Sequence, residues 1–226
     1  MLVRHLNGQE VETEFSSWAA SLALVLTYAD EFKNGYVCVL DRTLLPTVTI
    51  YHVPDLKEAM NSTRWNFGPY PEEYLAHGII NGPGFKALST QKLHDLGVWK
   101  EIPILSHYDR SIIWWKENGV NWNGHPVVPI RVQDARKMRG FAEHFGSHFT
   151  VVMTAALLSI TRRQRDLRNV FLYSDMQALR EGLDGLEVLR SANKLAHGVY
   201  VDGYEVVAQL MDMLDRLVLL EQGRTW

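Results

Sequence analysis

Apolar side chains recur along this chain at two spacings, and the balance between the two changes near residue 133. Before that point a helix-like repeat over Ser17–Phe32 precedes short runs rich in β-branched and aromatic residues. These runs predict strands at Tyr36–Leu40, Val48–Val53, Glu73–Ile80 and Phe85–Ser89, with a short helix at Asp55–Met60. Gly and Pro residues punctuate the segments between them, and Asn61–Pro71 predicts a loop. The first part of the chain is therefore expected to mix helices and strands.

Beyond residue 133 the repeat is helical throughout. Apolar residues three and four apart predict helices at Asp134–Phe145, Phe149–Phe171, Met176–Ala196 and Val206–Glu221. Pro126–Val132 predicts a strand just before them, whereas Thr90–Asn123 has no clear period. We expect an α+β fold, with a module over residues 1–132 and a mainly helical region over residues 133–226 that continues it or packs within the same domain.

Composition limits the partners of the chain. With 46% hydrophobic and 22% charged residues among 226, it has the balance of an ordinary globular protein. A net charge of −3 provides no basic field, so we expect no nucleic-acid partner. The longest apolar stretch, Val151–Leu158, is too short to span a bilayer. We therefore expect a cytoplasmic protein without membrane association, and the oligomeric state stays open.

The single cysteine, Cys38, lies within the apolar run Tyr36–Leu40. One cysteine excludes a disulfide within the chain, and a reducing compartment is its natural location. Because no neighbouring group would lower its pKa, we expect Cys38 to be a core residue and not a nucleophile.

Residues with the chemistry of a functional site gather between Arg4 and Ser89. Arg4 lies on a short apolar first strand, and Phe15–Trp18 forms a turn that opens a helix. Two strands follow, and Glu73 then opens a strand that runs into His-Gly-Ile. Each signal alone has a simpler explanation. Ser16 or Ser17 would serve as the N-cap of the helix, where serine is favoured, and single charges are common at surfaces. The order of the four features is what indicates a site.

This order resembles the ADP-ribosyltransferase fold of the cholera-toxin type. In that family an arginine on the first strand contacts NAD, a Ser-Thr-Ser strand end precedes a helix, and a glutamate precedes a run that ends in Gly-Ile. The segments Phe15–Leu22, Tyr51–Leu56 and Glu73–Gly78 are also similar to an uncharacterised family of fungal proteins with this enterotoxin-like core. The resemblance covers residues 2–89.

The resemblance implies a site that uses NAD and transfers ADP-ribose to an intracellular target. Glu73 would stabilise the positive charge that develops on the ribose as the nicotinamide bond breaks, and Ser16 would position Glu73. Arg4 would hold a phosphate or a ribose through forked hydrogen bonds. Ser17 would also contact NAD. Aromatic residues before the glutamate would stack on nicotinamide: Trp65, Phe67 and Tyr70.

Two positions depart from the family pattern. Trp18 stands where the family has its third serine, and Pro71 stands where arginine-modifying members carry a second acid. The resemblance therefore does not imply arginine as the acceptor. A non-catalytic protein-interaction module that keeps the fold remains an alternative, and seven tryptophans suit either a binding surface or a core.

The helical region supplies a competing hypothesis. Arg190 and His197 resemble the Arg-x(4–6)-His signature of HEPN helical ribonucleases, which cleave RNA across a dimer. The same residues are equally typical of a helix end, because Gly198 follows and a histidine is favourable near a helix C-terminus.

Two further clusters have simpler explanations. The basic run Arg162–Arg165, with Arg168, is typical of a solvated helix face, although it could contact phosphates of NAD or RNA. His144 and His148 are four residues apart, but Gly146 lies between them and no third ligand is near in sequence. We therefore predict no metal site.

Overall fold

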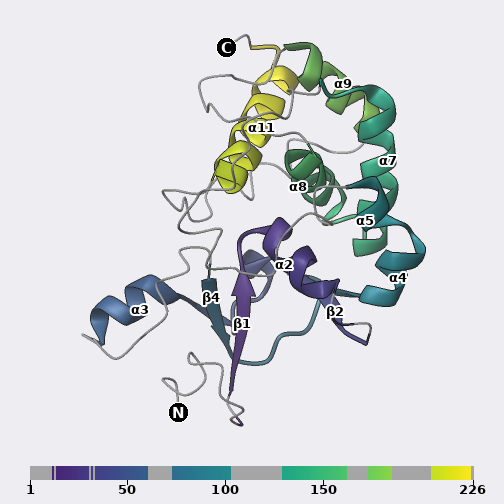
Figure 1. Cartoon of the computed structure of the whole chain (residues 1–226). Helices are drawn as coiled ribbons and strands as arrows, with labels where there is room; N and C mark the ends of the chain where they lie inside the picture. Colours follow the sequence, from purple (N-terminus) through teal and green to yellow (C-terminus); the bar gives the residue numbers. More distant parts are fainter. Residues whose placement is uncertain are drawn as a thin grey trace.

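The computed structural model describes residues 12, 14–30, 32, 34–60, 73–102, 129–161, 173–184 and 205–224. The strands and helix α3 (Val53–Ala59) lie at one end of the molecule, and the long helices lie at the other (Figure 1). Helix α2 (Leu22–Ala29) lies between these two parts (Figure 1). The described residues form a mixed α and β structure, in agreement with the α+β class expected from the sequence.

Three strands form an antiparallel sheet with β4 (Glu73–His77) in the middle. β4 pairs on one side with β1 (Phe15–Ala19) and on the other with β3 (Thr49–His52). Its consecutive residues Leu75 and Ala76 are both buried, although neighbouring residues of a strand point to opposite faces. β4 is therefore covered on both of its faces.

A second sheet pairs β2 (Tyr36–Leu40) with β5 (Phe85–Ser89). Apolar side chains from both sheets meet in one small cluster: Trp18, Leu40, Leu45, Val48, Ile50, Ala76, Ile80 and Phe85. Cys38 lies opposite Ala87 on β2 and is partly buried. Burial raises the pKa of the Cys38 thiol, which agrees with a packing role.

The first strand corrects the sequence-based prediction. The helix expected over Ser17–Phe32 begins only at Leu22, because Phe15–Ala19 extends as β1 instead. The N-cap is Ser21, whose Oγ accepts a hydrogen bond from the backbone of Leu24, so a cap at Ser16 or Ser17 is wrong. Pairing with the buried strand β4 outweighs the local helical repeat, as tertiary contacts commonly do.

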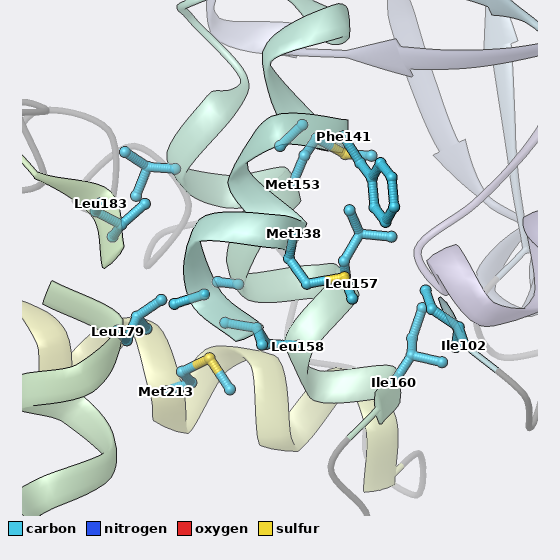
Figure 2. Packing of buried hydrophobic residues seen from close by; sticks show 14 of the residues in the cluster. Ile102, Met138, Phe141, Met153, Leu157, Leu158, Ile160, Leu179, Leu183 and Met213 are labelled. Carbon is cyan, nitrogen blue, oxygen red and sulfur yellow. The ribbon is translucent and has the colours of Figure 1, made fainter. Parts of the chain in front are cut away.

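Helix α8 (Thr150–Thr161) forms the centre of the helical part. Every residue from Met153 to Ile160 is buried, which requires neighbours on all sides of the helix. α7 (Val132–Ala142) and α11 (Glu205–Glu221) pack against α8, and α9 (Tyr173–Leu183) packs against both of them. Figure 2 shows the buried side chains of these helices meeting around α8.

One hydrophobic core crosses residue 132. Ala23 and Leu26 of α2 belong to the same buried cluster as the residues of α7, α8, α9 and α11. The short helices α4 (Thr90–Asp95) and α5 (Val98–Glu101) extend this connection. Trp99 donates its indole N–H to the carbonyl of Leu26 at 3.2 Å, inside the core.

The strand predicted at Pro126–Val132 is wrong for residues 129–132, which are the part of this range that the structure describes. Residues 129–131 form no strand, and α7 begins at Val132. The backbone N–H of Ile130 donates to the buried carboxylate of Asp175 at 2.9 Å, and not to a neighbouring strand. Three of the four predicted helices are confirmed within the described residues, with η3 (Glu143–Phe145) continuing α7 as a tighter turn. The helix predicted over Met176–Ala196 is wrong at Asp184, because α9 ends at Leu183 and Asp184 has a positive φ of 29°.

The close approach of α7 and α9 at Gly182 gives a stability prediction. A Cβ at Gly182 would overlap the side chain of Ala135 and lie 3.2 Å from its backbone carbons. We expect Gly182→Ala to lower the free energy of unfolding by about 1–3 kcal/mol despite the better helix propensity of alanine. Chemical denaturation measures the change.

Gly140 provides the matched control, because it lies in α7 and a Cβ there would meet no atom within 4 Å. Gly140→Ala should raise stability by roughly 0.5–1 kcal/mol. A Gly182→Ala protein as stable as Gly140→Ala would show that the two helices do not pack this closely.

Candidate functional site

Three of the predicted site residues lie in the described part of the chain: Ser16, Ser17 and Glu73. The other residues named in the hypotheses lie outside it: Arg4, Trp65, Phe67, Tyr70, Pro71, the basic run at 162–165 with Arg168, Arg190 and His197. The three described residues lie on two neighbouring strands, β1 and β4.

The pairing of β1 with β4 decides which side chains share a face. Ala19 lies opposite Glu73, Ser17 opposite Leu75, and Ser16 opposite Ala76. Directly opposed residues of an antiparallel pair point to the same face, and the side alternates along each strand. Ser17 and Glu73 therefore share one face of the sheet, whereas Ser16 points to the other.

Ser16 acts as a hydrogen-bond acceptor on the opposite face of the sheet. Its Oγ accepts the indole N–H of Trp18 at 2.7 Å. Trp18 in turn meets Phe85 edge-on, with ring centroids 6.4 Å apart, in the cluster between the two sheets. The structure thus does not bring Ser16 to Glu73, and the predicted positioning contact between them is not formed.

The face that carries Ser17 also collects side chains from all three strands. We call it the Glu73 face, and the register assigns to it Phe15, Ser17, Ala19, Thr49, Tyr51, Glu73, Leu75 and His77. Ser17 is exposed, Glu73 is half-buried, and Leu75 in the middle is fully buried. The hydroxyl of Ser17, the carboxylate of Glu73 and several rings therefore surround the buried side chain of Leu75.

Three rings of this face contact one another. The centroid of Phe15 lies 5.2 Å from that of His77 and 6.4 Å from that of Tyr51. Nε2 of His77 lies 2.9 Å from Oε2 of Glu14, just before β1. Sequence reasoning missed these residues as site candidates. The signal that could have found them is strand alternation, once Phe15–Ala19 is recognised as a strand.

A second polar pair joins the strands to the helical region. Asp41 directly follows β2 and caps the short helix η1 (Arg42–Leu44), while His148 lies just before α8. His148 Nε2 and Asp41 Oδ2 are 2.7 Å apart, and Asp41 Oδ1 accepts from the backbone N–H (2.9 Å) and the hydroxyl (2.6 Å) of Thr43. Both side chains are half-buried. Because Asp41 follows a strand and His148 precedes α8, the pair connects the strands to the helical region.

The surroundings of Asp41 determine its ionisation. Burial alone would raise the pKa of Asp41. Hydrogen bonds from Thr43 and His148, together with the charge of His148, outweigh burial and hold the pKa below the ordinary value of an aspartate. The folded protein therefore favours the charged form of this carboxylate.

His148 is thereby engaged by Asp41 and does not form a pair with His144. Among the residues that the structure describes, no group of three or more His, Cys, Asp or Glu side chains is placed to hold a metal ion. None of the helices in the described ranges has the length and apolar character needed to cross a bilayer.

Comparison with known proteins adds no relative. No family model, no curated protein and no solved structure matches the chain. Its function must therefore be inferred from the residues and their arrangement.

The Asp41–His148 pair gives a pH prediction. A lowered folded-state pKa means that Asp41 contributes stability above its unfolded pKa, about 3.9, and that this contribution is lost as pH falls through the folded pKa. Asp41→Asn should cost about 1–2 kcal/mol at pH 7 and remove this part of the acid destabilisation. Urea unfolding measured from about pH 2 to about pH 7 covers the titration of Asp41 and reports both effects.

The control is Asp30, which faces His94 at 3.5 Å and is about half exposed. Asp30→Asn should change stability by less than about 0.5 kcal/mol. Parallel pH profiles for the Asp41→Asn protein and the wild type would contradict the assigned role of the Asp41 charge.

Proposed function

We propose that the chain is an ADP-ribosyltransferase-like protein that uses NAD as a substrate, with Glu73 as its catalytic carboxylate. The observation that carries the proposal is the pairing of β1 with β4. The serine-containing segment and the segment that begins with glutamate are distant in sequence, and the family resemblance assigns them to one site. As neighbouring strands they can contribute side chains to one substrate.

The side chains of the Glu73 face suit the chemistry of this reaction. Breaking the bond between nicotinamide and ribose leaves positive charge on the sugar, and a carboxylate beside that carbon stabilises the charge. With water as the acceptor, the products are nicotinamide, ADP-ribose and a proton, and Glu73 can accept that proton from the attacking water.

Ser17 takes the positioning role that the sequence assigned to Ser16. It lies on the strand beside Glu73, two residues from the position directly opposite, and on the same face. Such diagonal neighbours have Cα atoms about 7–8 Å apart. That spacing allows one ribose to contact the hydroxyl and the carboxylate together.

The register also changes the meaning of the tryptophan in the serine motif. Trp18 lies opposite Tyr74 and points away from the Glu73 face, into the cluster between the sheets. A tryptophan at this position therefore removes no hydroxyl from the face that carries Glu73. This departure from the family pattern is compatible with an active site.

The two serines give a sharp test on adjacent residues. Release of nicotinamide from NAD is measured for the wild type, Glu73→Gln, Ser17→Ala and Ser16→Ala. We expect Glu73→Gln to lower kcat at least about 100-fold, because it removes the charge that stabilises the transition state. Ser17→Ala should lower kcat/KM about tenfold, which corresponds to one hydrogen bond.

Ser16→Ala serves as the matched control for Ser17→Ala. It should leave kcat/KM within about twofold and instead lower stability by about 1 kcal/mol, because the Trp18 indole loses its acceptor. Glu58→Gln, an exposed carboxylate on α3, controls for the loss of one negative charge. Turnover that survives Glu73→Gln would refute the catalytic assignment. A folded wild type without turnover would favour the non-catalytic interaction protein.

A further inference from the structure

The three contacting rings of the Glu73 face lie at the far end of β4 from Glu73. We call Phe15, Tyr51 and His77 the aromatic cluster. Glu73 and His77 are the first and last residues of β4, and both point to the same face. Four residues of a strand separate their Cα atoms by about 13 Å. This distance exceeds one nucleoside, and an extended dinucleotide spans it.

Two rings of the aromatic cluster, those of Tyr51 and His77, are partly exposed. Both rings lie beside the ring of Phe15. Tyr51 is nevertheless 37% exposed, and the side chain of His77 is 42% exposed. Aromatic side chains presented in this way stack with nucleobases, and each stacked base contributes about 1–3 kcal/mol.

Glu14 adds charge selectivity beside these rings. Its side chain is 84% exposed, and its contact with Nε2 of His77 holds the carboxylate next to the aromatic cluster. A carboxylate accepts hydrogen bonds from the two hydroxyls of a ribose, and it repels a phosphate at the same position. Dinucleotide sites use an acidic residue in this way to distinguish NAD from its 2′-phosphorylated form.

We infer that the aromatic cluster binds the adenine of NAD while Glu14 accepts from the adenosine ribose, so that the protein takes NAD in preference to NADP. This inference rests on the proposed function, which assigns the nicotinamide end to Glu73. The reacting bond then lies beside the first residue of β4 and the adenosine beside the last, and the diphosphate between them passes outside the covered side chain of Leu75.

Binding of ADP-ribose to the full chain tests the inference without any reaction. By calorimetry we expect ADP-ribose to bind at least about tenfold more tightly than 2′-phospho-ADP-ribose. Tyr51→Thr, which keeps a strand-favouring side chain, should weaken ADP-ribose binding about tenfold or more, and Tyr51→Phe should restore it because the ring returns. Glu14→Gln should bring the two affinities within about threefold of each other.

Asp55→Asn is the matched control for Glu14→Gln. Asp55 also pairs with a histidine, His52, at 3.1 Å and is 79% exposed, but His52 points to the opposite face of the sheet. This variant should keep both the affinity and the preference of the wild type. Circular dichroism checks that each variant is folded, and the Glu14→Gln comparison decides the question if Tyr51→Thr does not fold.

The outcomes separate this inference from the proposed function. No ADP-ribose binding, equal affinity for the two ligands, or binding unaffected by both Tyr51→Thr and Glu14→Gln would overturn the inference, even if turnover depends on Glu73. ADP-ribose binding that follows the expected pattern, without any NAD turnover, would support the inference and defeat only the catalytic assignment.

Discussion

The strand arrangement depends on the position of β4 between β1 and β3. Because the middle of β4 is buried on both faces, its register assigns each residue to one face, and a shift of one residue would exchange the two faces. The register with β1 therefore fixes two results at once. It directs Trp18 into the cluster between the sheets and Ser17 to the same face as Glu73. The packing of one face and the chemistry of the other follow from the same hydrogen-bonded pairing.

The helical part supports this arrangement from a distance. α8 is buried on all sides and holds α7 and α11 around it, and α2 joins the same core immediately after β1. The Asp41–His148 pair adds a polar contact across the boundary near residue 132, and the indole of Trp99 connects α5 to α2. Both contacts join groups far apart in the sequence, 107 residues for Asp41 and His148 and 73 residues for Leu26 and Trp99. The helices thus contribute to holding β1 and β4 in place.

Sequence patterns predicted the strands β2, β3, β4 and β5 and the helices α7, α8 and α11 within the described residues, because there the local repeat of apolar residues matches the packing of the fold. They did not predict that α9 ends at Leu183. Prediction failed for β1, because Phe15–Ala19 runs into a helical repeat and only pairing with β4 makes it a strand. It failed again near Ile130, whose backbone partner is the carboxylate of Asp175 far along the chain. Glu73 was placed on the right strand, whereas Ser16 and Ser17 were expected in a turn that opens a helix. Which serine faces Glu73 depends on cross-strand register, and no local pattern encodes that register. The aromatic cluster was missed for the same reason.

The central claim is the register of β1 against β4, and nuclear magnetic resonance measures it directly. In the isotope-labelled full chain, cross-strand nuclear Overhauser contacts should connect Ser17 with Leu75 and Trp18 with Tyr74, as the pairing requires. Contacts of Ser16 with Leu75 would contradict the account, because that register turns Ser16 and not Ser17 toward the face of Glu73.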